Sequence, residues 1–267
     1  MPGMPGNKYI HIYIYTGRKA ASGRKHAGLL VRSSRQITQK KMFSFGVFWY
    51  TNATKTKGCK IMGAVKEATL AVGGLSNTSK MPCKSWGISA KECKTGSKLA
   101  KIEGTICNGC YALKGAYVWP VVERAHARRL ELINTSSWVE NMVTAINNAP
   151  FFRWFDSGDL QNPEHLEDIV RVAIATPNTK HWLPTHEKKF VSDYMRKRGD
   201  FPDNLIVRLS AANVDGAPPK GFKLTSTSHK HGDPIGQECI AYKQDNECRD
   251  CRACWDSEVQ NISYKNH

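Results

Sequence analysis

The sequence predicts an α/β fold in which a mostly parallel sheet forms a partial (β/α) barrel. From residue 120 onward, short apolar segments alternate with segments of helical period, which is typical of β-α-β units. Each apolar segment ends in a hydrogen-bonding side chain, as strands often do at the ligand-binding edge of a parallel sheet. An irregular cysteine-bearing region precedes these units, and a C-terminal cysteine loop follows them.

The first 117 residues predict little regular structure. Residues 9–15 alternate between apolar and aromatic or His positions, which predicts a short strand. Residues 42–80 mix short apolar runs with Gly, Asn and Thr, and we expect strands and loops there rather than a long helix. Residues 81–117 form the irregular cysteine-bearing region.

Two helices are predicted before the alternating units. Pro120 suits the first turn of a helix, and an apolar stripe continues to Ile133. Ser137 and Glu140 form an S-x-x-E capping box, which predicts a second helix from there to about Asn147.

The alternating units predict further strands separated by helices. Strands at this spacing are joined by β-α-β crossovers, which place them parallel in one sheet. The predicted strands are 151–156, 181–185, 205–210 and 222–226, and the predicted helices are 163–175 and 188–197.

Length and charge predict one domain with a basic extension. A chain of 267 residues that is 40% apolar can form one large domain. The net charge is +16, and nine Lys or Arg fall in residues 1–41, whereas the first carboxylate is Glu67. We therefore expect a basic, disordered extension over 1–41 and a single domain over 42–267, with Met1 or Met42 as the native start. Such an arm could contact nucleic acid.

The composition also predicts the cellular compartment of the protein. No run approaches the roughly 18 apolar residues of a membrane span, and no secretory signal is evident. We expect a cytoplasmic protein without a membrane partner. In a reducing compartment, cysteines at close spacing are ligands more often than disulfides.

The C-terminal cysteine group consists of Cys239, Cys248, Cys251 and Cys254, and its last three members form a C-x2-C-x2-C run. Three thiolates on one tight loop are typical of iron–sulfur ligation, and four complete the protein ligands of a [4Fe–4S] cluster. Structural zinc usually takes two pairs from separate knuckles. The nearby cations Lys243, Arg249 and Arg252 would offset the negative charge of a thiolate-bound cluster.

A first cysteine group precedes the helices, and its members are Cys83, Cys93, Cys107 and Cys110. Only Cys107 and Cys110 form a tight pair. The two groups could hold one cluster each, or they could converge on a single cluster. Spacing alone leaves both arrangements open.

The predicted strand ends supply candidate ligand-binding residues. These are Ser157, Gly158, Asp159, Thr185, Ser210 and Asn213. A ligand site at this edge would use such polar groups. The alternative is that they are turn formers and helix N-caps, which every junction between a strand and a helix needs.

The order of these motifs resembles the phage gene product 88 domain family. The shared elements are the CYA ending at Ala112, the SGD at 157–159, and the closing C-x2-C-x2-C-W that ends at Trp255. The similarity spans about residues 45–258. It implies a virus-encoded iron–sulfur protein, distantly similar to the partial barrel of radical S-adenosylmethionine enzymes. The C-x3-C-x2-C signature of those enzymes is missing from residues 83–110.

Three functions follow as hypotheses. The leading one is an iron–sulfur protein, with one or two [4Fe–4S] clusters, that acts in electron transfer, in redox sensing or in an uncharacterised reaction with a redox partner or small ligand. The second is a radical S-adenosylmethionine-like enzyme acting on a nucleotide or nucleic acid, with S-adenosylmethionine as cofactor. The third is a zinc-stabilised nucleic-acid-binding protein. The sequence assigns no catalytic residue.

Overall fold

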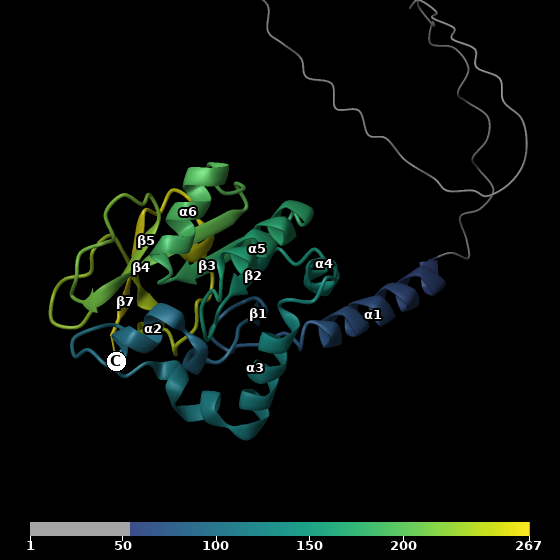
Figure 1. The fold of residues 1–267 in the computed structure, drawn as a ribbon, viewed down its shortest axis with the longest axis horizontal. Coiled ribbons are helices and arrows are strands. Elements are labelled where there is room, and N and C mark those ends of the chain that lie inside the picture. Colours follow the sequence, from purple (N-terminus) through teal and green to yellow (C-terminus); the bar gives the residue numbers. More distant parts are fainter. Residues whose placement is uncertain (1–53, 267) are drawn as a thin grey trace, which may run out of the picture. The chain divides into compact units, whose positions relative to one another are not determined.

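A computed structural model describes residues 54–266, so the strand predicted over 9–15 and the extension predicted over 1–41 lie outside the described residues. Seven strands form one sheet in the order β1-β2-β3-β4-β5-β7-β6, and every neighbouring pair is parallel (Figure 1). The strands are β1 Ser85–Trp86, β2 Phe151–Trp154, β3 Lys180–Thr185, β4 Leu205–Val214, β5 Thr225–His229, β6 Gln237–Cys239 and β7 Asn261–Lys265. The α/β class is confirmed.

Helices occupy the connections between the early strands. The α-helices are α1 Thr54–Ala71, α2 Lys94–Leu99, α3 Pro120–Leu132, α4 Trp138–Ile146, α5 Pro163–Ala175 and α6 Lys188–Arg198. Short 3-10 helices are η1 Ala90–Glu92, η2 Tyr111–Leu113, η3 Gly115–Val118, η4 Ile240–Lys243 and η5 Ala253–Trp255. Helix α1 packs on α4, α4 on α5, and α5 on α6. No helix in residues 54–266 is both long and apolar enough to cross a membrane.

The main core lies between the sheet and these helices, and it is rich in tryptophan. Trp86, Trp138 and Trp154 are fully buried and contact one another, with ring centroids 5.4 to 6.4 Å apart. The indole Nε1 of Trp86 donates to the carbonyl of Val72 at 2.9 Å. Aromatic side chains bury large apolar areas, so this cluster is a major source of stability.

The segment 42–80 was predicted to be strands and loops, and this is wrong for residues 54–71, which form α1. Gly58 and Gly63 weaken an isolated helix by about 1 kcal/mol each. Tertiary packing compensates, because Ala68 and Val72 at the end of this segment are buried in the main core. The helix is therefore stabilised by contacts that its own pattern does not reveal.

The later helices follow the prediction closely. Helix α5 has the predicted bounds, and α3, α4 and α6 differ from theirs by a residue or so. The predicted capping box does not form. Ser137 has φ −96° and ψ 4°, and its side chain accepts no hydrogen bond from a backbone N–H of the helix. Instead the backbone N–H of Trp138 donates to the carbonyl of Thr135 at 3.0 Å.

The C-terminal strands were predicted less well. Strand β5 begins at Thr225, three residues later than the predicted strand, and all five of its residues are buried despite being polar. Cross-strand bonds satisfy them: Thr225 Oγ1 donates to Asn261 Oδ1 at 2.8 Å, and His229 Nδ1 pairs with Ser263 Oγ at 2.8 Å. Strand β7 pairs with both β5 and β6, so the chain after β6 folds back and adds its last strand between these two.

His165 on α5 is a buried polar group in the main core. Its ring lies 5.5 to 5.7 Å from those of Trp86, Trp138 and Phe155, and neither ring nitrogen has a hydrogen-bond partner. Burial lowers the pKa of His165 from 6.5 to about 3, because the charged imidazolium would lose its hydration. The unfolded chain therefore binds a proton near pH 5 that the folded chain does not.

His165→Phe should remove this source of acid sensitivity. Between about pH 3 and pH 6.5 the unfolded state binds the extra proton, so wild-type stability falls as the pH falls through this window. The stability advantage of the variant should grow by about 1.4 kcal/mol for each pH unit below 6.5. Denaturant unfolding of both proteins at a series of pH values measures this, and a pH-independent difference would contradict it.

Candidate functional site

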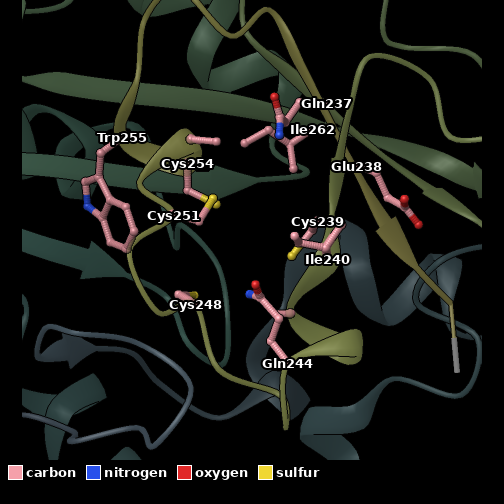
Figure 2. A pocket seen from close by; sticks show the side chains of 12 residues that line it. Gln237, Glu238, Cys239, Ile240, Gln244, Cys248, Cys251, Cys254, Trp255 and Ile262 are labelled. Atoms are coloured by element: carbon pink, nitrogen blue, oxygen red, sulfur yellow. The ribbon is translucent and has the colours of Figure 1, made fainter.

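The C-terminal cysteine group lines one pocket. Cys239 lies at the end of β6, and Cys248, Cys251 and Cys254 follow on the loop to β7. All four line one pocket that is partly open to solvent. Figure 2 shows the four side chains around this pocket, with Cys239 across from the other three. The four thiols of the C-terminal group therefore share one pocket, and their role as metal ligands stays a prediction.

Trp255 attaches the cysteine loop to the sheet. Its indole is buried, and its Nε1 donates to the carbonyl of Phe152 on β2 at 2.9 Å. Its ring packs edge-on against Trp182 and Phe151, with centroids 5.3 and 5.5 Å away. Because Trp255 follows Cys254 directly, these contacts fix the end of the cysteine loop over β2 and β3.

Arg208 on β4 is hydrogen-bonded to the same loop. Its side chain is fully buried, and its guanidinium donates to five backbone carbonyls of the loop. The acceptors, at 2.7 to 3.5 Å, are the carbonyls of Ala253, Cys254, Asp256, Val259 and Gln260. An arginine can satisfy this many acceptors because its planar guanidinium carries five N–H groups in fixed directions. The loop conformation therefore depends on one side chain of the sheet.

Cys83 lies with the C-terminal group, although the sequence placed it in the first group. Met81, Trp182 and Trp255 form a small buried cluster, and Cys83, Cys248 and Cys254 pack against it. Burial raises the pKa of Cys83 to about 11, opposed by the positive charge of Arg153 and reinforced by Cys248. The structure therefore makes Cys83 a neighbour of the second group.

Cys93, Cys107 and Cys110 form the three-cysteine group. Cys93 precedes α2, and Cys110 precedes η2. A Cβ added at Gly96 of α2 would lie 3.0 Å from Cys93 Cβ, with Cys93 Sγ and Cys107 Sγ at 3.5 and 3.6 Å from the same point, so both sulfurs lie beside this glycine. Burial raises the pKa of Cys107 to about 12, helped by the nearby Cys110 and Asp159.

The sulfurs of both groups are more widely spread than the ligands of one ion. Within the part of the chain that the structure describes, no three His, Cys, Asp or Glu side chains are arranged closely enough to hold a metal ion. Zinc needs all its ligands within about 2.3 Å of one point. The thiolates of a [4Fe–4S] cluster bind different iron atoms and so stand further apart.

Asp159 and Thr185, two of the predicted ligand residues, are hydrogen-bonded to each other at the strand ends. Asp159 accepts hydrogen bonds from Thr185 Oγ1 at 2.6 Å and from the backbone N–H groups of Leu160 and His186 at 2.8 Å. Burial outweighs these bonds and raises the pKa of Asp159 to about 7. The carboxylate is fully engaged within the protein, which suits a structural role at the strand ends.

Glu187 links the strand ends to the three-cysteine group. Its carboxylate accepts from Thr95 N at 2.8 Å and from Thr95 Oγ1 at 2.9 Å, and Thr95 lies on α2 two residues after Cys93. Its own backbone N–H donates to Thr185 Oγ1 at 2.9 Å. Asp159, Thr185 and Glu187 therefore hold α2 over the carboxyl end of β3.

The other predicted ligand residues make local contacts. Ser157 is buried, its hydroxyl has no partner, and its carbonyl accepts from Ile88 N at 3.1 Å. Ser210 Oγ pairs with Ser226 Oγ at 3.1 Å. Asn213 is exposed and forms a backbone bridge with Thr105. These contacts tie Ser210 and Asn213 to β5 and to residue 105, and not to the Asp159–Thr185 pair.

Gly158 has a structural reason to be glycine. It has φ +81°, and an added Cβ would lie 2.5 Å from Ile88 Cγ1 and 2.7 Å from the carbonyl oxygen of Ile88. Gly199 has a similar φ of +85° with nothing within 4 Å of such a Cβ. The SGD turn therefore needs no bound cofactor to account for its glycine.

Gly158→Ala should cost about 3 kcal/mol of unfolding free energy, because strain from positive φ adds to a steric clash. The matched control is Gly104→Ala: Gly104 has φ +79° with nothing within 4 Å of an added Cβ, so the change should cost about 1 kcal/mol from backbone strain alone. Denaturant unfolding measures both. Equal costs would show that the contact with Ile88 relaxes freely.

The sequence reasoning missed several residues around the cysteines. Arg208 and Arg153 went unnoticed, although each is a charged residue inside an apolar strand segment, LIVRLS and FFRWF. A charge at such a position is almost never buried without a partner, which was a usable signal. Gly96 and Glu187 carried no signal in the sequence, because their roles depend on how α2 sits.

The fold and the site define an α/β protein with an all-parallel sheet and cysteines gathered in two places near it. The family model described as Gene product 88 matches residues 47–257, and the chain belongs to this family of phage gene products. No curated protein and no solved structure matches the chain.

Proposed function

We propose that this phage protein is an iron–sulfur protein whose C-terminal cysteine group holds a [4Fe–4S] cluster for a redox or electron-transfer role in the host cytoplasm. The observation that carries the proposal is the convergence of Cys239, Cys248, Cys251 and Cys254 on one pocket. Four thiolates complete the protein ligands of such a cluster, which supplies one-electron chemistry when bound.

The residues around this pocket suit an anionic group. Arg208 lies against the backbone of Cys254, with Nε 3.2 Å from its carbonyl oxygen. The buried cluster of Met81, Trp182 and Trp255 limits solvent on one side. Both charge and solvent access tune iron–sulfur centres.

We further propose that the sheet is a partial barrel around this site. The sheet has edge strands β1 and β6, so the hydrogen-bonded order of the described strands is open. Ligands bind outside the carboxyl ends of strands in open parallel sheets. The three-cysteine group lies at this edge, because Glu187 ties α2 to the end of β3.

Anaerobic purification with iron and zinc analysis tests the proposal. We expect a brown protein with about four irons for each cluster. A colourless protein that binds zinc in equal amount with the chain would contradict the proposal and would support the zinc-stabilised alternative.

One observation favours a radical S-adenosylmethionine-like enzyme as second candidate. Cys93, Cys107 and Cys110 gather without Cys83, and three thiolates would leave one iron of a [4Fe–4S] cluster without a cysteine ligand. Adding S-adenosylmethionine should then change the electron paramagnetic resonance spectrum of the reduced protein. An unchanged spectrum with saturating cofactor would exclude this candidate.

A further inference from the structure

The two places where cysteines gather have neighbours of opposite charge. Beside the three-cysteine group lie two carboxylates, Asp159 and Glu187, and Glu187 accepts two bonds from Thr95 of α2. Thr95 lies two residues after Cys93. Asp159 accepts from Thr185 Oγ1 at 2.6 Å, and the same hydroxyl accepts from the backbone N–H of Glu187 at 2.9 Å, so both carboxylates lie beside this group.

The C-terminal cysteine group has arginines as neighbours instead. Arg208 Nε donates to the carbonyl of Cys254 at 3.2 Å, and Arg153 Nη1 donates to Sδ of Met81, in the buried cluster against which Cys248 and Cys254 pack. The backbone N–H of Cys248 donates to the carbonyl of Lys80 at 2.8 Å. The polar environments of the two places thus differ in sign, and this difference comes from strands β2 and β4, which carry the two arginines.

The cations nearest in sequence to the C-terminal cysteines add less positive charge to this site, because carboxylates pair with two of them. Lys243 lies 3.4 Å from Glu238, and Arg249 lies 3.0 Å from Asp245. Arg153 has no carboxylate within salt-bridge distance among the described residues, and its buried Nε has no hydrogen-bond partner. Arg153 is half-buried, and the carboxylate of Asp156 lies close enough to favour its charged form. Its charge can therefore act on an anionic group bound beside it.

Arg153 also lies between the two places. Its guanidinium stacks over Trp182 at 4.6 Å, and Nη1 donates to Met81 Sδ at 3.4 Å, beside Cys83. Its Nη2 donates to the hydroxyl of Tyr111 at 3.5 Å. Tyr111 directly follows Cys110 of the three-cysteine group. A chain of contacts therefore connects the two cysteine sites through the half-buried Arg153.

We propose that the two places are separate cluster sites and that the cluster on the C-terminal cysteine group has the higher reduction potential. This inference rests on the proposed function. A positive neighbour stabilises the more negative, reduced form of a cluster, and a negative neighbour stabilises the oxidised form. An electron given to the three-cysteine site by a low-potential one-electron donor would pass to the C-terminal site. The first cluster is then oxidised, the second is reduced, and no bond or proton changes.

A reductive titration with dithionite, followed by electron paramagnetic resonance, tests this on the full chain with its iron and sulfide. We expect two separate steps. Cys251→Ser should lose the step at higher potential, and Cys107→Ser should lose the step at lower potential. These two variants assign each step to its site without any assay of activity.

Charge variants then test the cause of the difference. Arg153→Gln should lower the potential of the upper step more than that of the lower step, because it removes a cation. Arg153→Lys keeps the charge and should restore most of the shift. Glu187→Gln should raise the lower step, because it removes an anion. Exposed Arg171→Gln is the matched control and should move neither step.

The outcomes separate this inference from the proposed function. A protein without iron overturns both. About four irons and one step, lost in Cys251→Ser and kept in Cys107→Ser, overturn the inference and leave the proposed function standing. Two steps in the reverse order, or an upper step that Arg153→Gln does not lower, overturn the assignment of the potentials to these charges.

Discussion

Replacing Cys251 by serine is expected to remove the C-terminal cluster and to lower the free energy of unfolding by about 4 kcal/mol or more. Cys251 is the exposed member of its group. An exposed substitution without a ligand effect changes stability by only about 0.5 kcal/mol. A large loss would therefore come from lost ligation and not from lost packing.

Denaturant unfolding and visible absorbance measure the two parts of this prediction on the same samples. The control compares the same two proteins after a chelator has removed the metal. Their free energies of unfolding should then agree within about 0.5 kcal/mol. A Cys251→Ser protein that keeps its colour and its stability would show that Cys251 is not a ligand.

Arg208→Met is expected to cost about 4 kcal/mol, the second large effect. The methionine keeps an apolar stem, but five loop carbonyls lose their donor. A carbonyl that stays buried without a partner costs about 1–3 kcal/mol, so a loss of about 4 kcal/mol corresponds to two such carbonyls, with water reaching the others as the loop loosens. The loop around Cys254 should loosen, so hydrogen exchange of residues 253–260 should accelerate together with the loss of stability.

Arg171→Met is the matched control for this variant. Arg171 is exposed on α5 and pairs with Asp168 three residues earlier, at 2.9 Å. Such a surface pair contributes about 0.5 kcal/mol. Arg208→Lys should fall between the two, because lysine keeps the charge and loses the planar guanidinium. An Arg208→Met protein as stable as Arg171→Met would show that the loop is held by other contacts.

The parts of the fold that were predicted correctly are those where the spacing of apolar residues and the residues that start or end an element indicate the same structure. Helix α5 begins at Pro163 after the N-cap Asn162, whose side chain accepts from His165 N, and its apolar stripe faces the core. Each of these features acts locally, so the sequence displays them directly. The same applies to the strand that starts at Leu205.

The parts that were missed depend on partners distant in sequence. The polar residues of β5 are buried because β7 supplies groups such as Asn261, and no local pattern announces that pairing. Helix α1 is held by packing on α4 that its glycines obscure. Hydrophobic pattern therefore failed where side-chain bonds between strands, or contacts between helices, decide the structure.

The candidate site was predicted in part. The C-x2-C-x2-C spacing indicated the convergence of Cys248, Cys251 and Cys254, because residues that close in sequence share one loop. Spacing could not assign Cys83, which folds back against Cys248. The role of the polar strand ends as ligand groups stays a prediction; in the structure Asp159 and Thr185 bond to each other and to the backbone.

Acid-labile sulfide in the anaerobically purified protein is the most direct measure of the central claim. Inorganic sulfide is present in an iron–sulfur cluster and absent from a zinc site or a single iron bound by cysteines. The account predicts about four sulfides for each cluster, with those of the C-terminal site lost in Cys251→Ser. A well-folded protein that contains no sulfide would contradict it.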